Sequence, residues 1–300
     1  MKNTIFLLGA KDPEMDIIQE LLEEKHLNFQ FARASNGRSN ATNAYQSIND
    51  LSRYKRAIFI ECDNINPPNI STFIDHHREG DFGYEYDYNF FLKASSLGQL
   101  ISLLINEGLM DDLYEETCSD ELQVNEYTYF KNKWMFKKNN EVCFVIPEKY
   151  VRIAAIDHDL SAVYEGKCKG ISMDDVRSER IKDIGITAEG ERELIALFSR
   201  YEGIFKGENK NILNLTHLDL GVGYTMDYLC LRELSMIKRQ PIFIKTKDYG
   251  DDRSKFIFIG VTKDFVTRVL EERTYKNYTF VEVFGVPNRR YVGGFTKEGE

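Results

Sequence analysis

Three short stretches of the chain combine acidic residues with cysteine or histidine, and each directly follows or lies within an apolar segment. They are Glu61-Cys62-Asp63, Asp75-His76-His77 and Asp157-His158-Asp159. Hard divalent cations bind several carboxylate oxygens, and imidazole ligands extend the choice toward manganese. Two such ions about 4 Å apart can activate water and stabilise the transition state of phosphoryl transfer. These residue types therefore predict metal-assisted chemistry on a phosphate ester, provided that the three stretches meet.

A structural role is the alternative for each stretch taken singly. An isolated Asp or His near the end of a strand commonly caps a turn or helix, or lies in a solvated loop. A fourth acidic stretch, residues 12–16, follows the first apolar segment of the chain. The shared placement of these stretches after strands favours one common site over four unrelated caps.

The elements that must position these residues alternate between strand and helix over the first 110 residues. Compact apolar runs predict strands at residues 4–8, 29–32, 57–60 and 71–74, while helical spacing predicts helices at 13–24 and 97–108. Pro13 suits the first turn of a helix, and Ser95 or Ser96 can cap the later one. Alternation of this kind predicts a mostly parallel sheet flanked by helices. Ligands of such sheets bind at the carboxyl ends of the strands.

The rest of the chain predicts a hairpin, further helices and a second domain. Residues 127–136 and 142–146 flank a polar turn, and cations interleaved with aromatic residues leave open either a solvated hairpin or a ligand-gripping flap. Helices are predicted at 149–164, 189–205 and 264–273, and strands at 242–245, 256–260 and 279–284. A junction rich in glycine and asparagine near 203–211 divides the chain into a first domain, 1–200, and a smaller C-terminal α/β domain, 205–300.

Composition excludes some classes of function. The 300 residues carry a formal net charge of −9, which argues against broad binding of duplex DNA. No apolar run approaches the roughly 20 residues needed to span a bilayer, and the apolar start is too short for a signal sequence. Five scattered cysteines favour reduced thiols and a cytoplasmic location. A compact anionic ligand remains compatible with all of these properties.

The order of these motifs resembles that of the DHH-type phosphoesterases, a superfamily that includes manganese inorganic pyrophosphatases, RecJ-type exonucleases and phosphodiesterases acting on oligonucleotides and cyclic dinucleotides. The namesake tripeptide is Asp75-His76-His77, and Asp63 and Asp157 match the acid motifs before and after it. The superfamily's first motif, a strand followed by His-x-x-Pro-Asp-x-Asp, matches here at Pro13 and Asp16. Ala10 replaces its histidine and Glu14 replaces its first aspartate, so one expected metal ligand is missing.

The resemblance implies a role for each matched residue. Asp63 would bridge the metals, His76 would ligate one of them, and His77 would face the substrate phosphate; these three form the expected catalytic set. His158 is the candidate replacement for the missing histidine. The expected ligands of Mn²⁺, or of Mg²⁺ in its place, are Glu14, Asp16, Asp63, Asp75, His76, Asp157 and His158.

A second group of residues is expected to bind the substrate. Arg78 follows the tripeptide and could reach a phosphate, with a surface salt bridge as the alternative. The stretch from Arg289 to Gly294 resembles the glycine-rich substrate-binding segment of the superfamily's second domain, because adjacent glycines admit phosphate to backbone amides; a plain β-turn is the alternative. The expected substrate-binding residues are His77, Arg78, Ser95, Ser96, Arg289, Arg290, Gly293 and Gly294.

Two main readings of function follow. The first is a metal-dependent phosphoesterase acting on a small nucleotide, a cyclic dinucleotide or a short oligonucleotide. The second is a DHH-like protein that has lost hydrolysis and that binds or senses a nucleotide, with or without a metal, as the substitution at Ala10 favours. An interaction scaffold with a coincidental motif is a third alternative. No membrane partner is expected, and a homo-oligomer remains open.

Overall fold

The computed structural model of the 300-residue chain contains two compact units. It describes residues 3–176 except 36, 40–42, 85, 111, 118–122, 124, 140–141 and 175, together with residues 216–222, 235–236, 241–247 and 253–296. The first unit comprises residues 1–160 and 168–171, and the second comprises 161–167 and 172–300. The domain boundary predicted at 200–205 and the helix predicted at 189–205 lie outside the described residues.

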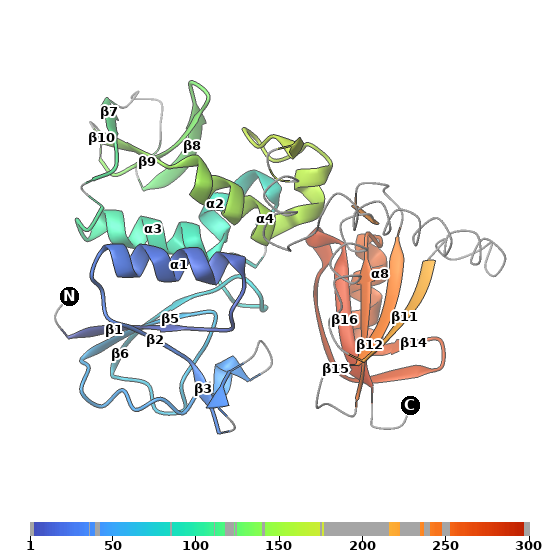
Figure 1. The fold of residues 1–300 in the computed structure, drawn as a ribbon. Helices are drawn as coiled ribbons and strands as arrows, with labels where there is room; N and C mark the ends of the chain where they lie inside the picture. Colours follow the sequence, from blue (N-terminus) through green and yellow to red (C-terminus); the bar gives the residue numbers. More distant parts are fainter. Residues whose placement is uncertain are drawn as a thin grey trace. The chain divides into compact units, whose positions relative to one another are not determined.

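A four-stranded parallel sheet forms the centre of the first unit (Figure 1). Its strands run in the order β2-β1-β5-β6, and every neighbouring pair is parallel. The apolar runs predicted as strands supply the two central strands, whose side chains are almost all buried. The bounds are Thr4–Leu8 for β1, Phe29–Phe31 for β2, Arg56–Ile60 for β5 and Ile70–Ile74 for β6.

Helices α1 (Pro13–Glu24) and α3 (Ser96–Asn106) pack beside each other on one face of this sheet (Figure 1). Helix α1 begins as predicted, because Asp12 accepts a hydrogen bond from the amide of Met15 and Pro13 occupies the first turn. Ser95 caps α3 through the amide of Gly98. The opposite face of the sheet is covered by the segment around Ala44 and Leu51. The polar stretches named above follow the carboxyl ends of the strands, at one edge of the sheet.

A second, antiparallel sheet in this unit packs against α2 (Phe91–Ala94) and α3, with the order β7-β10-β9-β8. The predicted hairpin is present, since β9 and β10 are antiparallel neighbours, but its first strand needs correction. The expected strand 127–136 is two strands joined by a tight turn at Lys131 and Asn132, both with positive φ. Trp134 is buried against Phe91, so this sheet is neither a solvated hairpin nor a free flap. The bounds are Glu115–Thr117 for β7, Glu126–Phe130 for β8, Lys133–Lys137 for β9 and Val142–Val145 for β10.

Helix α4 (Glu148–Tyr164) ends the first unit and carries the third acidic cluster. It is interrupted at Asp159, whose φ of −151° and ψ of 77° are not helical. The division between the two units falls at the next residue, Leu160. The kink therefore separates Asp157 and His158, which belong to the third acidic cluster, from the part of α4 that belongs to the second unit.

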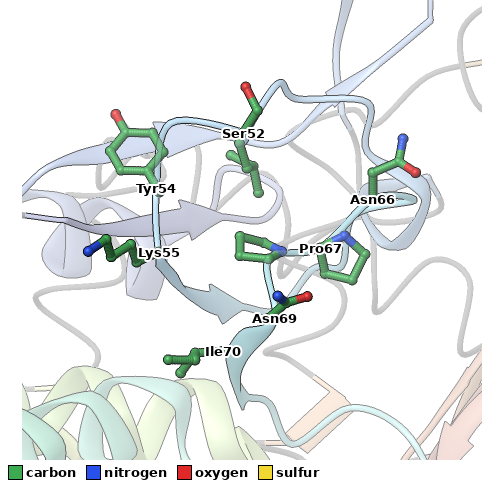
Figure 2. A pocket seen from close by; sticks show the side chains of 9 residues that line it. Ser52, Tyr54, Lys55, Asn66, Pro67, Asn69 and Ile70 are labelled. Carbon is green, nitrogen blue, oxygen red and sulfur yellow. The ribbon is translucent and has the colours of Figure 1, made fainter.

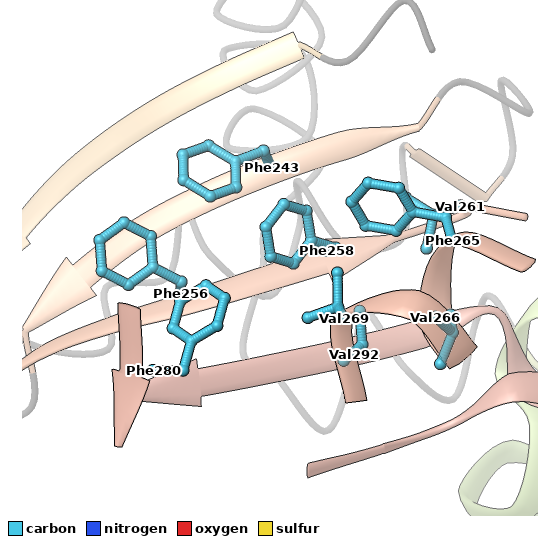
Figure 3. Close-up of a cluster of buried hydrophobic side chains, with 9 residues drawn as sticks. All are labelled: Phe243, Phe256, Phe258, Val261, Phe265, Val266, Val269, Phe280 and Val292. Atoms are coloured by element: carbon cyan, nitrogen blue, oxygen red, sulfur yellow. The ribbon is translucent and has the colours of Figure 1, made fainter. Parts of the chain in front are cut away.

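The second unit is built on a six-stranded mixed sheet in the order β11-β12-β13-β16-β15-β14, with helix α8 (Lys263–Glu272) packed against it. Aromatic residues from β12, β13 and β15 meet the apolar face of α8 in one core, which includes Phe243, Phe256, Phe258, Phe265 and Phe280 (Figure 3). The strands are β11 Thr216–Val222, β12 Ile242–Lys247, β13 Ser254–Ile259, β14 Thr274–Tyr275, β15 Tyr278–Val286 and β16 Tyr291–Thr296.

The predicted fold class is confirmed: a parallel sheet flanked by helices is followed by a smaller C-terminal α/β unit. Within the described part of the chain, no helix has the length and apolar character needed to cross a membrane. Cys62 and Cys168 are buried free thiols, whereas Cys143 is disulfide-bonded, which departs from the expectation that all thiols are reduced. The remaining short elements are β3 Arg33–Ala34, β4 Gly37–Arg38, η1 Ala44–Gln46, η2 Tyr88–Phe90 and η3 Pro287–Arg289.

Candidate metal centre

The first side chain of the site comes from the residue that directly follows β5. Glu61 adopts a left-handed backbone conformation, with φ of 52°. Its amide donates to the carbonyl of Ile74 at 3.0 Å, and Gly9 packs so closely that a Cβ there would lie 2.4 Å from the Glu61 carbonyl oxygen. A non-glycine residue pays about 1–3 kcal/mol for such a conformation, and strain of this kind clusters at functional sites. The carboxylate of Glu61 is thereby fixed at the carboxyl edge of the sheet.

The tripeptide after β6 is organised by its own aspartate. Asp75 Oδ1 accepts hydrogen bonds from the amides of His76 at 2.7 Å and His77 at 3.0 Å, and from Nδ1 of His77 at 3.1 Å. Its other oxygen, Oδ2, accepts from the Tyr45 hydroxyl at 2.6 Å. Although burial favours the protonated form, the hydrogen bonds from His77 and Tyr45 hold the pKa of Asp75 at about 2. Asp75 is therefore a charged anchor that orients the two imidazoles.

Four side chains bring one potential ligand atom each to within 4.8 Å of one another: Glu61, His76, His77 and Asp157. Nε2 of His76 lies 2.9 Å from Oδ2 of Asp157 and 3.7 Å from Oε1 of Glu61. Nδ1 of His77 lies 3.9 Å from the same Glu61 oxygen. All three stretches singled out in the sequence thus meet at one point, the first of them through Glu61 at the end of β5.

A single cation would draw these atoms slightly closer together. Ligand atoms bound to one ion at about 2.1 Å lie roughly 3.0–3.4 Å from each other, for octahedral or tetrahedral angles, and the separations here are 2.9, 3.7 and 3.9 Å. Glu61 Oε1 is buried without a hydrogen-bond donor among the described residues, whereas Asp157 Oδ2 is buried 2.9 Å from Nε2 of His76. A buried carboxylate oxygen without a donor is costly, and a metal ion is one of the partners that satisfies it. The donor set and the unsatisfied oxygen of Glu61 are therefore compatible with a metal site.

The charges around this point perturb one another strongly. Burial, only partly offset by His77, raises the pKa of Glu61 to about 8, and the neighbouring carboxylates of Asp12 and Asp157 add to the increase. Asp157 behaves in the opposite way, because the hydrogen bond and charge of His76 outweigh its burial and lower its pKa. Opposed shifts within one small cluster are typical of functional sites.

Two acids at the start of α1 extend the cluster. Glu14 is buried and accepts the amide of Leu97 at 2.9 Å, which ties it to the first turn of α3. Burial and the charges of Asp157 and Glu61 raise its pKa well above the usual value. Burial and Asp157 likewise raise the pKa of Asp12 to about 7. Glu14 therefore lies beside the metal-ligand group as expected, although it is not one of the four gathered donors.

Four more of the predicted ligands lie outside the group of gathered donors. Asp63 is not part of the group, because its Oδ1 accepts the amide of Asn64 in a local turn; the acid that converges on His76 is Glu61. Asp16 is half-exposed and pairs with Lys11 at 3.3 Å. Asp75 is an anchor, since both of its oxygens are already occupied. His158 is fully buried and contacts His76, without joining the four donors.

The predicted substrate-binding residues of the first unit differ in accessibility. The His77 side chain is 43% exposed, and Arg78 is exposed with its guanidinium carbon 3.2 Å from the centre of the Tyr45 ring. Ser95 and Ser96 are fully buried, and Ser95 is used as the cap of α3. The substrate role of the two serines is thus not supported, whereas that of His77 and Arg78 stays a prediction.

The C-terminal glycine-rich segment has a packing role in the second unit. Gly293 and Gly294 lie within β16, which is paired on one side with β13 and on the other with β15. A Cβ at Gly293 would lie 2.5 Å from the Phe284 ring. Their backbone is therefore used by the sheet, and the expected phosphate-binding role is not supported. Arg290 donates to the carbonyls of Gly260 and Val261 and to Glu165, while Arg289 lies in the short helix η3.

Sequence reasoning missed three contributors to the centre. Glu61 could have been found, because it is the first residue after an apolar strand. Asp12 was assigned to the acidic stretch but to no role, and its position as helix cap gave the signal. Tyr45 came from a polar loop with no pattern, so only the structure reveals its bond to Asp75.

A surface cavity of about 510 Å³ lies elsewhere in the first unit, near the amino ends of β5 and β6 (Figure 2). Ser52, Tyr54, Lys55, Asn66 and Asn69 contribute its polar lining, and none of its lining residues is an acid, histidine or cysteine. The amino ends of parallel strands are opposite the edge that usually binds ligands. This cavity is therefore separate from the candidate metal centre.

Comparisons with known proteins add little. No protein-family model matches the chain, and no curated protein sequence matches it. One solved structure, a pGpG-specific phosphodiesterase, PggH, from Vibrio cholerae, is similar with a TM-score of 0.28 and 12% sequence identity, covering 98% of this chain and 93% of that one. At this TM-score the likeness carries no argument.

Proposed function

We propose that this protein is a metal-dependent phosphoesterase that acts on a small nucleotide, a cyclic dinucleotide or a short oligonucleotide. The observation that carries the proposal is the convergence of Glu61, His76, His77 and Asp157, with a buried oxygen of Glu61 that lacks a donor among the described residues. Glu61, His76 and Asp157 would hold the ion, which when bound supplies Lewis acidity toward a phosphoryl oxygen and a more acidic water. The motif resemblance to DHH-type phosphoesterases supports the same reading.

The donor set favours manganese over magnesium. Two imidazoles and two carboxylates form a mixed site, whereas Mg²⁺ prefers oxygen ligands and retains several waters. Nδ1 of His77 already donates to Asp75 at 3.1 Å, so His77 is the weakest of the four candidate ligands. Glu61, His76 and Asp157 would form the core of the site. Mn²⁺ is therefore the first ion to test, with Mg²⁺ and Zn²⁺ as comparisons.

The exposed residues next to this core would position the phosphate. His77 is held by Asp75 and is partly open to solvent, and the carboxylates of Glu61 and Asp75 keep it protonated, since its pKa is raised to about 9 despite burial. Arg78 stacks on Tyr45, which limits the freedom of its guanidinium. A protonated imidazole and a preorganised guanidinium both suit a phosphate anion. These two residues would orient the substrate beside the core.

A binding protein without hydrolysis is the second candidate, and one specific feature favours it. Ala10 occupies the place of the first-motif histidine and cannot donate to a metal. The described residues gather four donors at one point, which fits one ion better than two. A site with one ion would bind a phosphate ligand, while the second ion used by two-metal phosphoesterases would be lacking.

Metal analysis followed by a substrate screen tests the proposal. The protein is purified, its metal content is measured, and release of product from nucleotides, cyclic dinucleotides and short oligonucleotides is followed with Mn²⁺. We expect about one bound ion per chain and turnover that Asp157→Asn abolishes. Asp50→Asn is the matched control, because Asp50 caps an exposed turn through Ser52. Bound metal and ligand without turnover of any substrate would favour the binding protein, and a wild-type chain that binds no metal would refute both metal-dependent readings.

A further inference from the structure

The fully buried His158 contacts the metal-ligand candidate His76 from the side opposite to the other donors. Nδ1 of His158 lies 3.4 Å from Nδ1 of His76, and Nε2 of His158 lies 3.1 Å from the backbone carbonyl of Tyr86. Nε2 of His76 faces Asp157 Oδ2 at 2.9 Å. Two consecutive residues of α4, Asp157 and His158, thus contact the two different nitrogens of one imidazole.

The Tyr86 carbonyl determines where the protons lie. A carbonyl oxygen only accepts hydrogen bonds, so Nε2 of His158 must carry a hydrogen and donate it. A neutral imidazole that is protonated at Nε2 has a lone pair at Nδ1. Nδ1 of His158 is therefore an acceptor, and Nδ1 of His76 must be the donor in the contact between the two rings. In the metal-free protein a second proton, on Nε2 of His76, would be shared with Asp157 at 2.9 Å. Loss of that proton to an incoming cation leaves the lone pair on Nε2, the nitrogen that points to Glu61 and Asp157.

Without this contact, the alternative tautomer of His76 would be favoured. Asp157 Oδ2 is close enough to accept a hydrogen bond from Nε2 of His76. A neutral His76 with its proton on Nε2 would satisfy Asp157 and block the coordination position, because a metal ligand nitrogen must be unprotonated. The acceptor on His158 opposes this arrangement, since it would leave two lone pairs facing each other across 3.4 Å.

We propose that His158 is a positioning residue that fixes the proton of His76 on Nδ1, so that Nε2 of His76 is available to a metal ion. The inference rests on the proposed metal centre, and it assigns His158 a role different from that of a replacement ligand. The ring of His76 is held from other directions as well. A Cβ at Gly83 would lie 2.6 Å from Cβ of His76, so the backbone packs directly against this side chain.

The rings can be examined directly by NMR. With ¹⁵N-labelled histidine, long-range ¹H–¹⁵N spectra distinguish the tautomers, and the chain has only five histidines to assign by substitution. Zn²⁺ serves as the diamagnetic probe. We expect His158 to carry its proton on Nε2 with and without Zn²⁺, and His76 to carry its proton on Nδ1 when Zn²⁺ is bound. A proton on Nδ1 of His158 would overturn the proposal in either state of the protein.

Metal affinity provides the second readout. His158→Leu removes the acceptor, and we expect the affinity for Zn²⁺ and Mn²⁺, measured by chelator competition, to fall about 10- to 100-fold. His158→Asn retains an acceptor oxygen near the position of Nδ1, and we expect it to recover at least half of that loss on a logarithmic scale. Equal losses of metal affinity in the two variants would show that His158 acts only through packing, and this result would refute the proposal.

The two measurements separate this inference from the proposed function. If wild-type protein binds neither ion, the metal centre fails, whatever the tautomer of His158. If wild-type protein binds the ions but His158 is protonated on Nδ1, the centre stands and the positioning role fails. Should His158→Leu not fold, the spectrum of wild-type protein still decides the tautomer.

Discussion

Replacing Glu61 by glutamine should stabilise the metal-free protein while removing its response to metal. Glu61 is only 8% exposed, and burial next to Asp12 and Asp157 raises its pKa to about 8 from a usual value of 4.5. The folded state therefore binds a proton at this side chain that the unfolded state has already released. Glutamine has nearly the same shape as glutamate and no titratable proton. Because both residues have a side chain, the strain of the left-handed backbone conformation is the same in the two proteins.

The sign and size of the effect follow from proton linkage. Between about pH 4.5 and pH 8 the folded protein holds more protons at Glu61 than the unfolded chain does, so the free energy of unfolding of the wild type falls as pH rises. Each pH unit in this window corresponds to about 1.4 kcal/mol. At pH 7 the raised pKa of Glu61 then lowers the free energy of unfolding by at most about 3 kcal/mol, and at pH 5 it lowers it by under about 1 kcal/mol. Protons taken up by Asp12 and Glu14 reduce the difference, so we expect about 2 kcal/mol at pH 7.

Urea unfolding of the metal-free protein in EDTA at pH 5, 6, 7 and 8 measures this difference. Glu61→Gln should gain stability over the wild type with rising pH, and added Mn²⁺ should stabilise the wild type alone. Glu107→Gln, which removes a carboxylate paired with Arg56 outside the cluster, controls for the change in net charge. A difference that is constant across pH, or a variant that Mn²⁺ stabilises as much as the wild type, would refute the reasoning.

Three further substitutions test other parts of the centre. Asp63→Asn should leave Mn²⁺ affinity within about threefold of the wild type, because the carboxylate of Asp63 accepts the amide of Asn64 and is not among the gathered donors; a loss above tenfold in calorimetric titration would restore it as a ligand. Gly83→Ala should destabilise the fold by about 1–3 kcal/mol and weaken Mn²⁺ binding at least tenfold, because the added methyl would lie 2.1 Å from the carbonyl oxygen of Ala94 and 2.6 Å from Cβ of His76; unchanged binding in the same titration would contradict this. Tyr45→Phe should cost about 1–3 kcal/mol in urea unfolding at pH 7, because Asp75 loses a donor to its buried carboxylate; a neutral effect would show that water replaces the hydroxyl.

The positions of the strand ends were predictable from the sequence, because they depend on local patterns. Apolar runs of four or five residues, bounded by polar residues, define β1, β5 and β6, and the proline and aspartate at the start of α1 define its first turn. Parallel strands bring their carboxyl ends to one edge, so the approach of Glu61 to His76 followed from topology, whereas that of Asp157, which lies on helix α4, did not.

The choice between neighbouring acids was not predictable. Glu61 and Asp63 both follow β5, and the motif resemblance selected Asp63. In the structure, Glu61 is the acid that reaches the centre, because its backbone is in the left-handed conformation. A glycine in the sequence would have indicated that conformation, whereas a glutamate does not. The role of Asp75 was missed for a related reason, since a carboxylate that organises its own turn and one that binds a metal have the same sequence signature.

The two glycines of β16 show a different limit. A pair of glycines after arginines fits both a phosphate loop and a place where backbone must approach aromatic rings. At Gly293 the decision depends on Phe284, nine residues earlier and on the adjacent strand. Such a contact depends on strand register, which composition does not reveal.

The energetic costs of the first unit are concentrated at the candidate centre. Glu61 is held in a strained backbone conformation, its buried Oε1 has no donor among the described residues, and the pKa values of Asp12, Glu14 and Glu61 are all raised by burial and mutual repulsion. A sheet edge that served only the fold would be more stable with neutral side chains at these positions. A bound cation would offset the electrostatic part of these costs, because it supplies positive charge and a partner for the buried oxygen of Glu61. The surrounding contacts hold the imidazole of His76 in place before any ion arrives, which is how a site built to bind a metal differs from a chance cluster of acids.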